Sequence, residues 1–163
     1  MLPDAPEPNS SAMYTNRDFK IAAAGICPGP DLEWFALDRD GNVGGFTNAG
    51  FAAVPTNVFD SYELFCQTRN VIESLPLRGD AVWVTEKPPC FDTWDDWAKR
   101  GLFGFDWNHY AGQPDPSLPY VAMSRPTDPI TVSDLPDDVA AYLKRVAFPN
   151  LSFDDTSDIL VMR

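Results

Sequence analysis

The stretch LEWFALDRDGNVGGFT, residues 32–47, is the part of the sequence that decides the predicted fold. It begins with LEWFALD and ends with VGGFT, two segments that contain the aromatic and β-branched residues favoured in strands. The pair Asp40-Gly41 lies between them and suits the positive φ angles of a tight hairpin turn. We therefore predict two antiparallel strands joined at residues 39–42, with a loop after them at residues 48–57.

Helix and strand patterns alternate along the rest of the chain. A capping box from Asp60 to Glu63 predicts a helix that Pro76 ends, and a shorter helix is expected from Trp94 to Arg100, where Gly101 stops it. Further strands are predicted at residues 80–86, 102–107, 120–124 and 158–162, and a last helix is expected to be capped by Ser133 or Asp134 and closed by Pro149.

This order predicts an α+β fold. The chain has 163 residues, which is enough for one main core, so we expect a single domain over residues 14–163. It should form a largely antiparallel sheet with about three helices packed on one face. Residues 1–13 are rich in proline and lack an apolar run, so they are predicted to be a disordered leader. The apolar run within residues 20–27 is too short for a secretion signal, and this segment is expected to begin a strand or loop.

The charge balance limits the partners of the protein. Asp and Glu number 24 against 12 Lys and Arg, which gives a net charge of -12. Nucleic acids and anionic membrane surfaces bind through cations, so neither is an expected partner. No run of about 18 apolar residues is present, which argues against a membrane span. A protein partner, neutral or basic, is expected instead.

Cysteine and histidine usage argues against a metal site and against any cofactor. Cys27, Cys66 and Cys90 are odd in number, their spacing matches neither a zinc knuckle nor a redox pair, and His109 is the only histidine. We predict free thiols, no metal and no cofactor, and a cytoplasmic location. The sole catalytic triad that could be assembled is Cys66 or Cys90 with His109 and an aspartate, and nothing in the sequence shows that they meet. Cys90, in a loop after two prolines, is the more exposed candidate. The protein is therefore predicted to be non-catalytic.

One short helix carries the candidate binding residues. Trp94 and Trp97 lie three residues apart and so share a helix face, with Asp95 beside them. Tryptophan is a frequent anchor of protein interfaces, so we predict that Trp94, Asp95 and Trp97 form a binding surface.

Several segments resemble small uncharacterised bacterial proteins. The resemblance is carried by Trp34 to Asp38, Gly50 to Pro55 (GFAAVP), Arg100 to Asp106 and Pro129 to Pro136. Proteins of this kind are similar to the immunity proteins that accompany bacterial toxins. The resemblance implies no catalytic residues, and it implies an acidic binding protein that neutralises a toxin. The alternatives are a housekeeping or structural module, or a small enzyme that uses Cys90, His109 or clustered aspartates.

Overall fold

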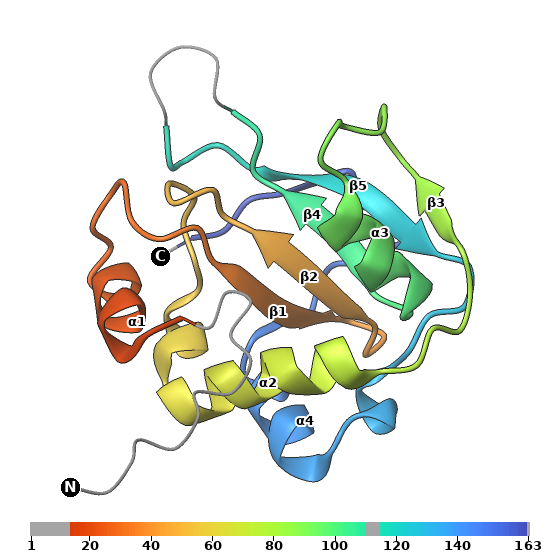
Figure 1. Cartoon of the computed structure of the whole chain (residues 1–163), viewed down its shortest axis with the longest axis horizontal. Helices are drawn as coiled ribbons and strands as arrows, with labels where there is room; N and C mark the ends of the chain where they lie inside the picture. Colours follow the sequence, from red (N-terminus) through yellow and green to blue (C-terminus); the bar gives the residue numbers. More distant parts are fainter. Residues whose placement is uncertain (1–13, 110–114, 163) are drawn as a thin grey trace, which may run out of the picture.

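The computed structural model describes residues 14–109 and 115–162 as one sheet with helices around it (Figure 1). The predicted leader at residues 1–13 lies outside the described residues. In chain order the elements are α1 (Asn16–Ala23), β1 (Glu33–Asp38), β2 (Val43–Thr47), a 3-10 helix (Thr56–Phe59), α2 (Tyr62–Ser74), β3 (Ala81–Trp83), α3 (Asp92–Lys99), β4 (Phe103–Asp106), β5 (Tyr120–Pro126), a second 3-10 helix (Val132–Asp134), α4 (Asp137–Lys144), β6 (Ala147–Phe148) and β7 (Asp158–Ile159).

The predicted hairpin is confirmed. Strands β1 and β2 pair antiparallel, with Glu33 opposite Thr47 and Leu37 opposite Val43. Gly41 has a φ of 80° in the turn, a conformation that glycine adopts without strain. The Asp38 carboxylate accepts hydrogen bonds from the backbone N–H groups of Asp40 and Asn42, both at 2.9 Å, so the turn is held by its own first residue.

The sheet is mainly antiparallel, as predicted. Its strand order is β3-β5-β4-β2-β1-β6, and β7 pairs with β5. The β1–β2, β3–β5, β4–β5 and β5–β7 pairs are antiparallel, whereas β1–β6 and β2–β4 are parallel. The parallel β2–β4 pair places the ends of both strands side by side, with Thr47 opposite Asp106.

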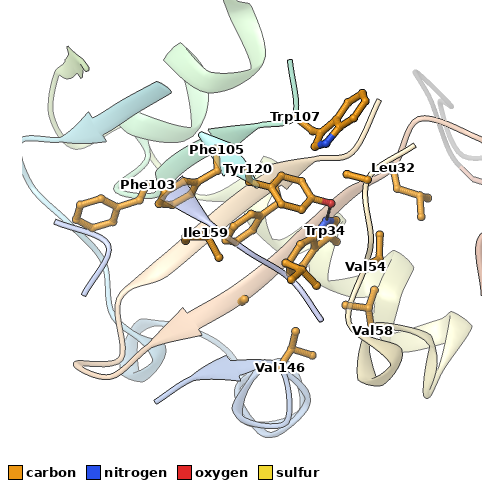
Figure 2. Packing of buried hydrophobic residues seen from close by; sticks show 14 of the residues in the cluster. Leu32, Trp34, Val54, Val58, Phe103, Phe105, Trp107, Tyr120, Val146 and Ile159 are labelled. Atoms are coloured by element: carbon orange, nitrogen blue, oxygen red, sulfur yellow. Dashed lines mark hydrogen bonds between the residues drawn. The ribbon is translucent and has the colours of Figure 1, made fainter. Parts of the chain in front are cut away.

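Alternating side chains of β1 face two different hydrophobic clusters. Trp34 belongs to a cluster on one side, where its indole N–H donates to the Tyr120 hydroxyl oxygen at 3.1 Å (Figure 2). Phe35 faces a second cluster, to which α2, α3 and α4 contribute Ile72, Trp97 and Leu143. The sheet is therefore a central layer that is buried on both faces.

The number and placement of the helices differ from the prediction. The described residues contain four α-helices, and α1 packs with the Trp34 cluster through Phe19, so the helices do not all contribute to the same cluster. Residues 20–27 were expected to begin a strand or loop, but the first part of this segment is the end of α1. The sequence signal for α1 is a capping box in which Thr15 and Asp18 exchange hydrogen bonds of 3.1 and 3.0 Å.

Several predicted element ends also require correction. Helix α2 is capped by Ser61 instead of Asp60, and α4 follows Pro136 without a side-chain cap. Asp134 instead forms a capping box with Thr131 around the second 3-10 helix, because the chain turns there before α4 begins. The predicted strands at residues 80–86 and 158–162 are shorter, and β6 was not predicted.

Candidate functional site

Helix α3, which holds the predicted binding residues, lies against β4 and β5 (Figure 1). Two glycines that face each other across β2 and β4, Gly45 and Gly104, leave room for its indole rings. A Cβ atom on Gly45 would lie 2.6 Å from the Trp97 ring, and one on Gly104 would lie 3.2 Å from Trp94. Trp97 is only 4% exposed as a result. Contrary to the predicted surface, Trp97 is a core residue and is not accessible to a partner.

The other two predicted residues reach the surface only in part. Trp94 is half-buried, and its carbonyl oxygen accepts a hydrogen bond from the Ser124 hydroxyl at 2.9 Å. The Asp95 carboxylate accepts from Lys99 at 2.7 Å and from the Trp83 indole N–H at 3.4 Å. The hydrogen bond from Lys99 is the main reason why the pKa of Asp95 is lowered. Asp95 therefore binds Lys99 within α3 and Trp83 in β3, so its carboxylate is already engaged inside the protein.

Cys90 and His109, the residues of the alternative cysteine site, have different surroundings. Cys90 is exposed in the loop before α3, and no hydrogen bond joins it to His109 within the described part of the chain. The His109 Nε2 atom lies 2.8 Å from the carbonyl oxygen of Pro119, and its ring packs edge-on against Trp107. Within residues 14–109 and 115–162, no group of three or more His, Cys, Asp or Glu side chains is arranged to hold a metal ion.

A hollow of about 380 Å³ lies elsewhere on the surface and was not predicted from the sequence. Four segments line it, at residues 22–30, 48–54, 116–117 and 160–162. Three of its lining side chains are large, apolar and exposed, with exposed fractions of 58% for Ile26, 55% for Leu160 and 81% for Met162. We call this hollow the apolar groove. Its lining side chains expose apolar surface to water, and a partner would cover that surface.

Backbone contacts join two of the loops that line the apolar groove. The Gly29 N–H donates to the Gly50 carbonyl oxygen at 2.8 Å, and a Cβ atom on Gly50 would lie 2.5 Å from the Gly29 oxygen. Gly50 also has a φ of 76°. The Asn48 side-chain oxygen accepts from Leu32 N at 2.7 Å and from Gly50 N at 3.0 Å. Only a glycine allows these loops to approach so closely, so the groove is held in shape by the fold.

Acidic residues adjoin several lining segments of the apolar groove in the chain. Among the described residues that line it, none is Lys or Arg, and exposed Asp31 and Asp115 directly adjoin its lining residues Pro30 and Pro116 in the chain. Ile26 also borders a second hollow, which Arg17 and Lys20 line. Asp158 is exposed two residues before Leu160. Charges of both signs therefore lie near the groove, and its apolar lining is complementary to an apolar side chain of a partner.

A buried carboxylate lies at the paired ends of β2 and β4. Asp106 is 6% exposed, and its Oδ1 atom accepts a hydrogen bond of 2.6 Å from the Thr47 hydroxyl. Burial raises the pKa of Asp106, and the hydrogen bond from Thr47 opposes this effect. The charge of Asp31 raises the pKa further, whereas that of His109 lowers it.

This raised pKa predicts a pH dependence of stability. Folded protein holds the Asp106 proton to higher pH than unfolded protein does, so stability falls as the pH rises through the window above the ordinary Asp pKa. The variant Asp106→Asn keeps an oxygen that accepts from Thr47 and has no charge to bury. We expect its melting temperature, relative to wild type, to be higher at pH 7 than at pH 4. A difference between the two proteins that is the same at both pH values would contradict this assignment.

Comparison of the chain with protein-family models, with curated proteins and with solved structures finds no match. Among the described residues, none of the helices has the length and apolar character needed to cross a membrane. The candidate site therefore rests on its geometry. Ile26 lies far in sequence from Leu160 and Met162, so no local sequence pattern predicts the groove.

Proposed function

We propose that the protein is a non-catalytic, acidic binding protein that docks a cationic protein partner in the apolar groove. The observation that carries the proposal is the gathering of exposed apolar side chains at one hollow. Among the described residues, seven large apolar side chains are exposed, and Ile26, Leu160 and Met162 all line this groove. Covering one such side chain contributes on the order of 1.5–3 kcal/mol, so a small number of anchors is enough for specific binding.

Charge supports a cationic partner. The net charge is -12, and Arg69, Arg78 and Arg100 are already engaged in ion pairs with carboxylates of the same chain. Much of the negative charge therefore remains uncompensated at the surface. Opposite net charges accelerate the encounter of two proteins and disfavour acidic competitors.

Neutralisation of a basic bacterial toxin is the most concrete form of this function. The resemblance to immunity proteins supports it, and an immunity protein acts by occupying a surface of its toxin without chemistry of its own. Cys27, Cys66 and Cys90 are all free thiols, which is consistent with the cytoplasm as the place of action.

The groove is tested by charge substitutions on matched apolar residues. We expect Ile26→Asp and Leu160→Asp to weaken binding of the partner at least about tenfold, because each replaces a buried contact by a desolvated charge. Leu77→Asp is the control, since Leu77 is 64% exposed and does not line the groove. Tagged wild type and variants are used to purify partners from the cells that natively produce the protein, at low and at high salt.

We expect wild type and Leu77→Asp to retain one basic protein. Both groove variants should fail to retain it, and high salt should release it from wild type. Co-expression with that partner should then relieve its toxicity only for proteins with an intact groove. Equal retention by the groove variants would show that the apolar groove is not the binding site. Retention of acidic or neutral proteins alone would contradict the proposed partner class.

A further inference from the structure

Strand β3 is an edge strand with unpaired backbone groups. In the β3–β5 ladder, Val84 N donates to Met123 O at 2.9 Å and Thr127 N donates to Asp80 O at 3.1 Å. Because the hydrogen-bonding direction alternates along an antiparallel pair, the N–H and C=O groups of Ala81 and Trp83 point away from β5. No hydrogen bond to these groups is found within residues 14–109 and 115–162. They are free to pair with another strand.

The side chains of this edge are apolar and exposed. Val82 is 51% exposed and Val84 is 39% exposed, and two residues apart on a strand they project from the same face. They are separate from the apolar groove, whose lining contains no residue of β3. The edge therefore offers both backbone hydrogen bonds and apolar contacts, which are the two requirements for strand addition.

The charges near β3 are more balanced than those of the whole chain. Asp80 and Glu86 are exposed there, but Arg125 lies opposite Val82 and Lys87 lies over the Phe91 ring at 3.8 Å. A strongly acidic protein repels its own copies, and a region with compensated charge is where two copies approach at the lowest electrostatic cost. This balance gives no preference for a cationic partner at the edge.

We propose that a second copy of this chain pairs with the β3 edge, antiparallel and about a two-fold axis at Val82. In this register Ala81 of one copy pairs with Trp83 of the other, so every outward N–H and C=O group of both residues is used. Val82 then faces Val82 of the second copy, and its exposed surface is covered. The two sheets become one continuous sheet, and the apolar grooves of both copies stay open.

Cysteine cross-linking tests this register. Directly opposed residues at a non-hydrogen-bonded position have Cα atoms about 4.5 Å apart, within the range that a disulfide spans. In a background of Cys27→Ser and Cys90→Ser, we expect Val82→Cys to form a disulfide-linked dimer under mild oxidation. Val84→Cys is the matched control, because it faces Asp80 of the second copy, and we expect it to cross-link at least about tenfold more slowly. Equal or absent cross-linking of the two variants would overturn the register.

The mass in solution provides a second test that needs no cross-link. We expect wild type to change from monomer to dimer as concentration rises in sedimentation equilibrium, and the dimer to be strengthened by salt, because salt screens the repulsion between acidic copies. Val82→Lys should remain monomeric, whereas Leu77→Lys should dimerise like wild type. Wild type that stays monomeric, or captures only a strand of a different protein, would overturn the proposal, as would a dimer that survives Val82→Lys.

Discussion

Replacement of Gly45 by valine is expected to lower the free energy of unfolding by about 3 kcal/mol. A Cβ atom at this position would lie 2.6 Å from the Trp97 ring, closer than any van der Waals contact allows. Gly45 is in the middle of the sheet, paired with Phe35 in β1 and Gly104 in β4, so the backbone has no room to withdraw. Helix α3 would have to lift from the sheet. Gly45→Ala should follow the same direction at about 2 kcal/mol, measured by denaturant unfolding.

A smaller side chain at position 97 separates this clash from a general loss of strand stability. Trp97→Leu alone should destabilise the protein, because a buried indole that also packs edge-on against Phe35 is lost. In the double variant Gly45→Ala and Trp97→Leu, we expect the loss to be smaller than the sum of the single losses by at least about 1 kcal/mol. Strict additivity would mean that Gly45 does not act through Trp97.

This contact explains why the hairpin was predictable and the role of Trp97 was not. The β1–β2 hairpin depends on residues close in sequence, from the strand formers around Trp34 to the Asp40-Gly41 turn, so a local pattern is sufficient. The burial of Trp97 depends on Gly45, far away in the sequence, whose lack of a side chain makes the space. The three-residue spacing of Trp94 and Trp97 indicates that they share a helix face. It does not indicate whether the sheet or solvent covers that face.

The apolar groove shows the same limit for a binding site. Ile26 lies more than a hundred residues before Leu160 and Met162 in sequence, and it meets them only because the 48–54 loop and the chain after β7 pass beside the end of α1. The α1 helix itself was missed although Thr15 and Asp18 carry a capping signal and its alanines favour a helix, because it has only eight residues and Gly25 follows it closely. Charge, by contrast, is a property of composition, so the expectation of a basic partner needed no fold.

Replacement of Asp38 by alanine is expected to lower the free energy of unfolding by about 3 kcal/mol. Besides the turn, the Asp38 carboxylate accepts a hydrogen bond of 2.9 Å from Phe153 N, in the chain after β6. Phe153 is fully buried between Phe46 and Phe105, so without Asp38 its N–H group has no partner and no access to water. One side chain therefore joins the first hairpin to the last part of the core.

The neighbouring carboxylate is the control for this role. Asp40 is 58% exposed and, within the part of the chain that the structure describes, pairs only with the exposed Arg39, so Asp40→Ala should change stability by less than about 0.5 kcal/mol. Hydrogen exchange distinguishes a local from a general effect. Asp38→Ala should lose protection first at the Phe153 amide, while amides of the β2–β4 pair stay protected until global unfolding. If Asp38→Ala and Asp40→Ala are equally stable, the buried carboxylate contributes only turn geometry, and the C-terminal segment must be held by its aromatic contacts alone.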